Sequence, residues 1–362
     1  MDYEFLEKLI KEKQKKFQNV SDAIWEYAEP AYNEFKSSLL QRQVMGAEGF
    51  SIKRGIGNIE TAFSASFGSG KPIIGFLGEF DALPGLSQKA NVTIQEPLSN
   101  DGYGHGCGHN LLGTAVMQAA VAVKDYLLQN KISGTVVYFG CPAEEGGAGK
   151  AFMVREGVFD DCDICLTWHP YSITSGSTTS LANARVYYNF KGVSSHAAAS
   201  PHLGRSALDS VELMNVGVNY LREHIIPEAR VHYAVTDTGG NAPNVVQAKA
   251  QVLYSIRAPK NDQIYDLLER VNNIAKGAAM MCGTTVDIQV VSAYADIVQN
   301  KTLDQLVFKH MRDIYPLDYT EEEIEYANRF YDIGNKTDAY MFQELAKRFY
   351  GEKGEGLFKG PL

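Results

Sequence analysis

Short apolar runs that alternate with longer helical patterns are the feature that most constrains how this chain can fold. Apolar runs occupy 73–77, 135–139 and 164–167, and residues 111–128 carry a helical pattern. Such alternation predicts an α/β domain in which functional side chains gather at strand ends. Because 362 residues exceed the size at which a single hydrophobic core stops growing, we expect two domains.

The pattern changes near residue 184. From there we expect alternating strands and helices at 185–192, 207–224, 250–257, 261–279 and 285–291. This order is typical of a small α+β sandwich of the split βαβ type. A helical pattern then returns at 301–312. The sequence therefore predicts the first part of one domain at 1–183, an inserted domain at 184–295 and a return to the first domain at 296–362.

Composition limits the class of protein. Apolar residues make up 45% and charged residues 21%, as in folded globular chains, and the net charge of -9 argues against nucleic-acid binding. No stretch resembles a membrane span, and residues 1–17 resemble a surface helix and not a secretory signal. Five irregularly spaced cysteines argue against a disulfide framework, and we interpret the Cys162–Cys165 spacing as packing. A cytoplasmic protein is expected.

The segment GHGCGHN at 104–110 places potential metal ligands at every second position. In an extended segment alternate side chains share one face, so Cys107 and His109 are expected to reach one metal centre together. A single His or Cys in a glycine-rich loop is usually a turn residue. Three potential ligands in alternation before an apolar helix favour a metal site.

Two adjacent carboxylates, Glu144 and Glu145, follow the apolar run at 135–139. Such a pair repels unless a cation or a shared proton offsets the cost, so one can bind metal while the other transfers protons. The alternative is an exposed acidic turn. A phosphate-binding loop ending in Lys150 is excluded, because that pattern requires glycine at position 144 and Ser or Thr at position 151.

Two other apolar runs also end in candidate ligands. His169 lies two residues after the run at 164–167 and is followed by proline, a position that suits a ligand beside a cleft. The segment GEFDALP at 78–84 follows the run at 73–77. Its carboxylates can bind metal or hold a histidine ligand in one tautomer.

Taken in this order, the strings GEFDALPG, GHGCGHNLLG, PAEEGGAGK and WHP resemble the zinc-dependent amidohydrolase and peptidase family of hippurate hydrolase, aminoacylase and carboxypeptidase G. The resemblance covers nearly the whole chain and is strongest to the aminobenzoyl-glutamate hydrolase branch. Asn110 favours that branch, because the hippurate-hydrolase branch commonly has aspartate there. The resemblance implies a zinc-peptidase-like α/β catalytic domain with a central sheet flanked by helices, and an inserted ferredoxin-like dimerisation domain.

The resemblance implies four metal ligands: Cys107, His109, Glu145 and His169. Cys107 would bridge two divalent ions, zinc or manganese. Glu144 would be the general base. Asp81 would not bind the metal itself but would hold one of its ligands in place. Glu79 stands where other branches have a ligating histidine.

In the inserted domain, His196 resembles the histidine that crosses to the partner subunit of a homodimer and polarises the scissile carbonyl. Asn244 and Arg257 resemble a pair that holds the substrate carboxylate, and the planar guanidinium group suits bidentate binding. The alternative for Arg257 is a surface charge on a strand face.

The implied function is hydrolysis of the amide bond of an N-acyl amino acid such as p-aminobenzoyl-glutamate, by a metal-activated water with a glutamate base. Two alternatives stay open: a dipeptidase of the same family, with a pocket for a free amino terminus, and a catalytically impaired, metal-poor binding protein. Product analysis separates the first alternative from the implied function, and metal content separates the second.

The end of the sequence departs from the family pattern. The resemblance calls for a further metal-binding histidine, whereas the last histidine is His310 and the chain stops at Leu362. The expectation is that the second metal site, part of the pocket and part of the main sheet are incomplete. This form would then bind metal weakly and have little activity.

Overall fold

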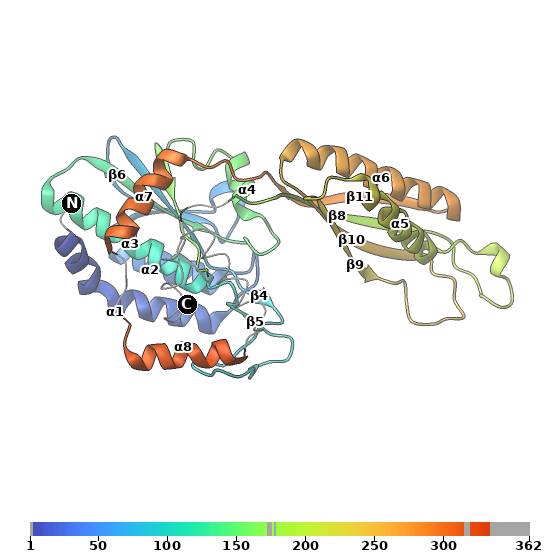
Figure 1. The fold of residues 1–362 in the computed structure, drawn as a ribbon, viewed down its shortest axis with the longest axis horizontal. Helices are drawn as coiled ribbons and strands as arrows, with labels where there is room; N and C mark the ends of the chain where they lie inside the picture. Colours follow the sequence, from blue (N-terminus) through green and yellow to red (C-terminus); the bar gives the residue numbers. More distant parts are fainter. Residues whose placement is uncertain (1–2, 172–175, 177–178, 315–318, 334–362) are drawn as a thin grey trace. The chain divides into compact units, whose positions relative to one another are not determined.

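The structure, a computed structural model, describes residues 3–171, 176, 179–314 and 319–333. The chain divides into two compact units, of which the second is Gly176–Leu306 and the first contains the residues before and after it (Figure 1). The boundaries at 184 and 295 that the sequence suggested both lie inside the second unit.

The first unit is built on a five-stranded mixed sheet in the order β1-β2-β6-β3-β7. Its strands are β1 (Ser51–Arg54), β2 (Phe63–Ser69), β3 (Ile73–Glu79), β6 (Gly134–Cys141) and β7 (Ile164–Leu166). β3 lies between β6 and β7 and is parallel to both. The carboxyl ends of these three strands therefore meet at one end of the sheet, where ligands of α/β proteins commonly bind.

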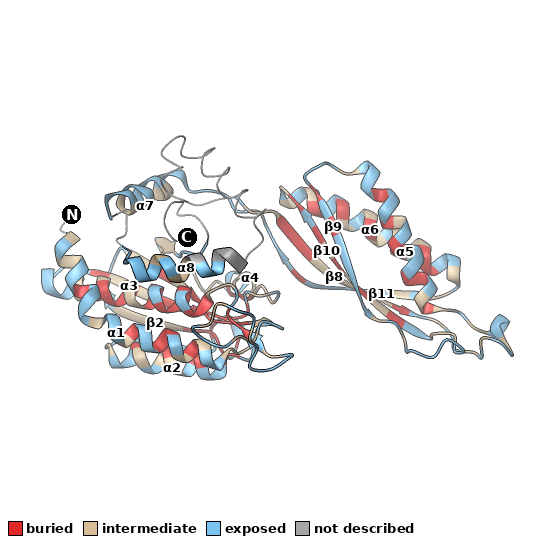
Figure 2. Cartoon of the chain, turned by 60° about the horizontal axis from the view of Figure 1, so that its bottom comes forward, coloured by how far each residue is buried: buried red, intermediate tan, exposed pale blue. Residues whose placement is uncertain are grey.

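Helices cover both faces of this sheet. On one face lie α1 (Tyr3–Tyr27), α2 (Phe35–Ala47) and α3 (His109–Asn130), which share a buried core with alternate residues of β6 (Figure 2). The intervening residues of β6 pack instead with α4 (Gly149–Arg155) and η1 (Ile56–Asn58). Each large side chain that such a layer buries fully contributes about 1.5–3 kcal/mol of transfer free energy.

Helix α3 corrects one expectation from the sequence. By length and composition it could cross a membrane, although no stretch was expected to resemble a span. Its apolar character is explained by its position, because it packs between α1 and the strands β3 and β6. Gly113 permits this close packing, since a Cβ atom there would lie 2.3 Å from the carbonyl oxygen of Glu79.

The second unit has the element order βαββαβ, with the antiparallel strand order β11-β8-β10-β9. Its elements are β8 (Ala182–Lys191), α5 (Ala207–Leu221), β9 (Arg230–Asp237), β10 (Lys249–Ala258), α6 (Asn261–Cys282) and β11 (Thr285–Tyr294). The core lies between the two helices and one face of the sheet. This is the ferredoxin-like arrangement, and the expected fold class is confirmed.

Strand β9 was not expected from the sequence. It pairs only with β10 and lies at the edge of the sheet, and among its residues only Val231 is buried. An edge strand with little burial carries a weak apolar alternation, which explains why its pattern was missed.

The remaining described elements are β4 (Leu83–Pro84), β5 (Tyr103–Gly104), η2 (Pro201–Leu203), η3 (Arg222–His224), α7 (Lys301–Ile314) and α8 (Glu321–Ile333). In α7, His310 Nδ1 lies 2.6 Å from the hydroxyl of Tyr3.

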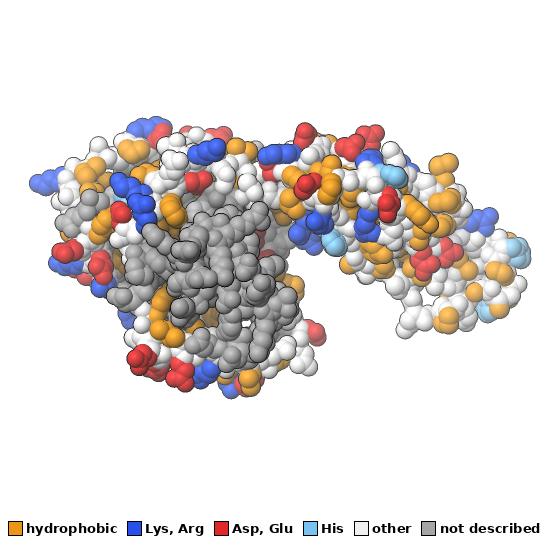
Figure 3. All heavy atoms as spheres, viewed as in Figure 1, with side chains coloured by type: hydrophobic (Ala, Val, Ile, Leu, Met, Phe, Trp, Pro, Cys, Tyr) orange, Lys and Arg blue, Asp and Glu red, His pale blue; other side chains and the backbone are white. Residues whose placement is uncertain are grey.

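Residues 334–362, on which the expectation of an incomplete sheet and site depends, lie outside the described residues. All five cysteines are free. On the face drawn in Figure 3, acidic and basic side chains of the described residues are interspersed.

Candidate metal centre

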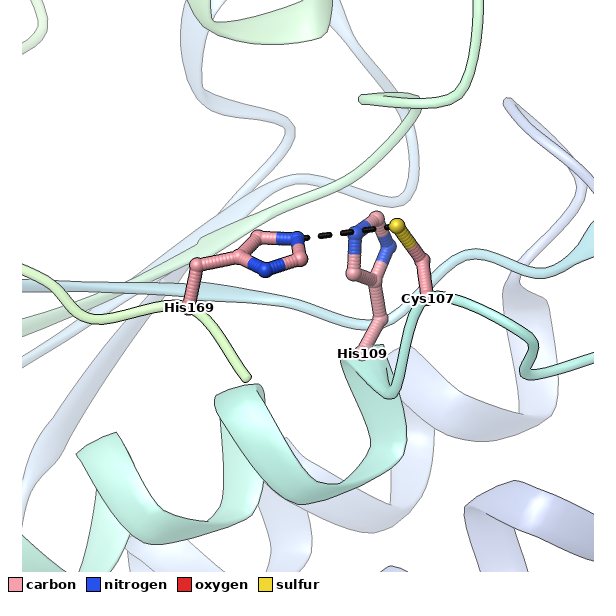
Figure 4. A group of neighbouring side chains, drawn as sticks. All are labelled: Cys107, His109 and His169. Carbon is pink, nitrogen blue, oxygen red and sulfur yellow. Dashed lines mark hydrogen bonds between the residues drawn. The ribbon is translucent and has the colours of Figure 1, made fainter. Parts of the chain in front are cut away.

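Three potential ligands meet at the carboxyl end of the main sheet. Cys107 precedes α3, His109 begins it, and His169 follows β7. One donor atom from each residue lies within 4.8 Å of the other two (Figure 4). The distance from Cys107 Sγ to His169 Nε2 is 3.6 Å. Zinc bonds of about 2.3 Å to sulfur and about 2.0–2.1 Å to nitrogen, at a tetrahedral angle, separate two donors by about 3.6 Å.

The local geometry differs from the extended segment that the alternating motif suggested. Residues 105–108 form a turn in which the backbone N–H of Gly108 donates to the carbonyl of His105. Gly108 has a φ of 74°, which glycine adopts without steric cost, and α3 begins at the next residue. The turn, and not a shared strand face, brings Cys107 and His109 together.

His105 faces away from the cluster. Its Nε2 lies 3.0 Å from the carbonyl oxygen of Ile24, and the side chain is buried. Burial lowers the pKa of His105 to about 4, so the ring is neutral near pH 7. The third member of the alternating motif is therefore a core residue.

Hydrogen bonds set the tautomer of both histidines in the cluster. Nδ1 of His109 lies 3.0 Å from Asp81 Oδ1, and Nδ1 of His169 lies 2.7 Å from the carbonyl oxygen of Pro170. Each Nδ1 must carry a proton to donate to these acceptors. In the neutral rings Nε2 then keeps its lone pair, which is the arrangement that metal-binding histidines use.

Three carboxylates lie beside His109. Its Nε2 is 3.1 Å from Glu79 Oε2, 3.8 Å from Glu144 Oε2 and 3.9 Å from Glu145 Oε1. Glu79, His109 and Glu144 form a second group whose donor atoms lie within 4.8 Å of one another. Nδ1 of His109 faces Asp81, so only Nε2 is open to a metal ion, and one nitrogen binds one ion. If two ions bind, the second must rely on the other side chains.

The two members of the acidic pair differ in environment. The Glu144 side chain is 43% exposed, whereas that of Glu145 is 16% exposed. The backbone N–H of Glu145 donates to Asp81 Oδ2 at 2.8 Å, which ties this residue to the support of His109. Partial burial, followed by the charge of Glu79, raises the pKa of Glu144.

These residues fit a divalent cation. Among the described residues, Glu79 Oε2, His109 Nε2 and Glu145 Oε1 are buried atoms without a hydrogen-bond partner. Buried polar atoms are rarely left unpaired, and here these three unpaired atoms are all potential metal ligands. Burial and the charge of Glu145 raise the pKa of Cys107 to about 12, so the thiol needs a metal ion to become a thiolate.

A buried carboxylate that the sequence did not single out supports the acidic pair. Glu34 accepts hydrogen bonds from the backbone N–H of Ala143, at 2.8 Å, and from the hydroxyl of Thr61, also at 2.8 Å. Ala143 immediately precedes Glu144 and has a φ of 58°, a conformation that non-glycine residues rarely adopt. Glu34 and Ala143 are 109 positions apart, so no local pattern could reveal this contact.

Because Glu34 is buried, we expect the stability of the wild type relative to that of Glu34→Gln to depend on pH. Burial raises its pKa from 4.5 to about 7, so the native state holds the proton more tightly than the unfolded state. The stability from that proton is complete below pH 4.5 and is lost as pH rises through 7. By this shift, wild type should lose up to about 3 kcal/mol between pH 4.5 and 8 relative to Glu34→Gln, which cannot titrate. Urea unfolding of both proteins at several pH values measures the difference. If the free energy of unfolding changed with pH in the same way for both proteins, the prediction would be wrong.

The other expected site residues lie in the second unit. His196 and Asn244 are neighbours. His196 forms an antiparallel β-bridge with Val245, and the backbone N–H of Ala197 donates to the Asn244 carbonyl. Asn244 and His196 are both exposed. Nδ1 of His196 accepts hydrogen bonds from two backbone N–H groups, at 3.2 and 3.1 Å. The ring proton of neutral His196 therefore lies on Nε2, where it can be donated.

The structure does not bring Arg257 to Asn244 within one chain. The loop that carries Asn244 leads into β10 at Lys249, whereas Arg257 is exposed near the other end of that strand. Eight residues of strand span about 26 Å. The pairing of Arg257 with Asn244 on one substrate carboxylate stays a prediction.

Comparison with known proteins places these residues in a family. Residues 75–257 match the model of peptidase family M20/M25/M40. The chain is 47% identical over 328 residues to the B subunit of p-aminobenzoyl-glutamate hydrolase from Escherichia coli, covering 90% of this chain and 68% of that protein. It is 30% identical over 298 residues to the Xaa-Arg dipeptidase of Mus musculus, covering 78% and 65%. The chain thus spans about two thirds of the length of these curated relatives.

Solved structures share the fold. The crystal structure of an aminobenzoyl-glutamate utilization protein from Klebsiella pneumoniae aligns with a TM-score of 0.67 at 18% identity, covering 91% of each chain. A dinuclear metal-binding peptidase of the M20 family from Bacillus subtilis aligns with a TM-score of 0.56 at 18% identity, covering 88% of this chain and 83% of the other. The family resemblance of the four motifs is confirmed: this chain belongs to peptidase family M20/M25/M40.

Proposed function

We propose that this chain is a metal-dependent amidohydrolase that cleaves the amide bond of an N-acyl amino acid, with p-aminobenzoyl-glutamate as the first substrate to test. The observation that carries the proposal is the convergence of Cys107, His109 and His169 with an adjacent pair of carboxylates at the end of the main sheet. The relative at 47% identity, which is named for p-aminobenzoyl-glutamate hydrolysis, supports the choice of substrate.

Four residues are proposed to hold divalent ions, zinc or manganese: Cys107, His109, Glu145 and His169. When bound, such ions polarise a carbonyl group and lower the pKa of a water molecule. Asp81 keeps Nδ1 of His109 protonated and so directs its Nε2 toward the ligand cluster.

Glu144 is proposed as the general base. It is the more exposed member of the pair, so it can reach both a water molecule and a substrate. Its carboxylate accepts a proton from the attacking water and delivers it to the leaving amine. A raised pKa suits both steps, because the group then gives up the proton and takes it with similar ease.

His196 of the partner subunit is proposed to donate its Nε2 proton to the scissile carbonyl oxygen, which is where negative charge develops. The second unit offers features that suit dimerisation: the edge strand β9 and an exposed apolar stripe on α5 formed by Leu213, Val216 and Tyr220. Because some relatives are named as two distinct subunits of one hydrolase, a different protein chain is the alternative partner.

A dipeptidase is the second candidate, and the Xaa-Arg dipeptidase relative favours it. The test is a hydrolysis panel on the purified chain with bound metal measured beforehand. The panel pairs p-aminobenzoyl-glutamate and other N-acyl amino acids with dipeptides, including some that end in arginine. We expect p-aminobenzoate release to exceed dipeptide cleavage by at least about tenfold in kcat/KM, or about 1.4 kcal/mol.

The opposite preference would favour the dipeptidase. A chain that binds no zinc or manganese and cleaves nothing would support the remaining alternative, a binding protein without catalysis.

A further inference from the structure

Glu79 has one carboxylate oxygen engaged and one free. Lys150 donates a short hydrogen bond to Glu79 Oε1. Oε2 is buried and has no hydrogen-bond partner, in a residue that is only 7% exposed. A buried carboxylate oxygen without a partner is costly, so a cation is expected at Oε2.

The atom facing that oxygen is also an acceptor. His109 Nε2 lies 3.1 Å from Glu79 Oε2, and it has no hydrogen-bond partner either. Because Nδ1 of His109 donates to Asp81, Nε2 of the neutral ring holds a lone pair. Two lone pairs at this distance repel unless a cation, either a proton on Nε2 or a metal ion, lies beside both. Metal bonds of about 2.0–2.2 Å that meet at about 90–110° separate two donors by about 2.8–3.6 Å, which includes the observed distance.

We propose that Glu79 is itself a metal ligand, which binds through Oε2 the same ion as His109. The proposal rests on the metal centre of the proposed function and extends its ligand set beyond Cys107, Glu145 and His169. A carboxylate oxygen of Glu144 belongs to the same group as donor atoms of Glu79 and His109, so the Glu79 side of the centre is rich in carboxylate oxygens. The other side carries the Cys107 thiol and the imidazole of His169.

This division gives the two sides different metal preferences. Carboxylate oxygens suit hard ions such as Mn²⁺, whereas thiolate and imidazole suit Zn²⁺. Lys150 occupies Glu79 Oε1, so Glu79 is expected to bind with one oxygen only. The ammonium group also offsets part of the negative charge that Glu79 adds beside Glu144 and Glu145.

The test measures metal binding and not activity. Mn²⁺ is titrated into metal-free protein and followed by the electron paramagnetic resonance signal of free Mn²⁺, and Zn²⁺ affinity is measured by competition with a chelator. For Glu79→Gln we expect the Kd for Mn²⁺ to rise by at least about tenfold, with a smaller change for Zn²⁺. The matched control is Glu96→Gln, which breaks an exposed ion pair with Lys89 of 2.9 Å. Its affinities should equal those of wild type.

A second variant guards against misfolding. Glu79→Gln alone leaves the Lys150 ammonium without its carboxylate, whereas Glu79→Gln with Lys150→Met removes both charges together. The double variant should fold, as judged by circular dichroism and thermal unfolding, and should still show the rise in Kd for Mn²⁺. A Kd within about twofold of wild type in either folded variant would overturn the proposal while leaving the metal centre intact. Wild-type protein that binds neither ion would instead overturn the centre and, with it, the proposed function.

Discussion

Replacing Glu144 by glutamine should reduce amide hydrolysis by about 10²- to 10⁴-fold, while bound metal stays near the wild-type level. The amide keeps the size of the side chain but cannot accept the proton of the attacking water. Glu144 is 43% exposed, so the substitution should leave the packing around it intact. The measurements are kcat/KM on the best substrate of the panel and metal per chain by elemental analysis.

Glu145→Gln is the matched comparison, because it makes the same chemical change at the next position. Glu145 is more buried and has an unpaired carboxylate oxygen, as expected of a ligand. This variant should lose metal affinity by at least about tenfold and lose activity with it. Equal metal loss in both variants would mean that the roles of the two glutamates are assigned wrongly.

Mixing two inactive variants should restore activity if His196 acts across a homodimer. In a hybrid of His196→Ala and Glu144→Gln chains, one site has both groups intact and the other has neither. With random exchange, about half of the dimers are hybrids and about a quarter of all sites are intact, so about a quarter of wild-type activity should return. The measurement is activity after subunit exchange, with the hybrid fraction counted by native mass spectrometry on tagged chains.

The controls separate the possible arrangements. Each variant incubated alone should stay inactive, and His202→Ala, which changes an exposed histidine nearby, should keep wild-type activity. Verified hybrids without recovery would remove the role of His196 across the dimer. If His196→Ala chains regain activity only with a different protein, the partner is that protein and not a second copy.

The sequence by itself determined the family and most of the regular elements. The strands that carry the candidate ligands are strongly apolar and end in distinctive residues, so β3, β6 and β7 and the side chains after them could be predicted. The ferredoxin-like unit followed from the order of its elements, except for β9. These features depend on the periodicity of neighbouring residues, which is present in the chain before it folds.

The tertiary structure alone decided which donor atoms face one another. His105 and His109 belong to the same motif, yet a turn directs one into the core and the other into the ligand cluster. Contacts across 109 positions, from Glu34 to Ala143, and across 71 positions, from Glu79 to Lys150, have no local signature. Such contacts arise from the path of the chain through the sheet. Periodicity reports only which face of its own element a side chain occupies, so it cannot reveal which distant residue will lie against that face.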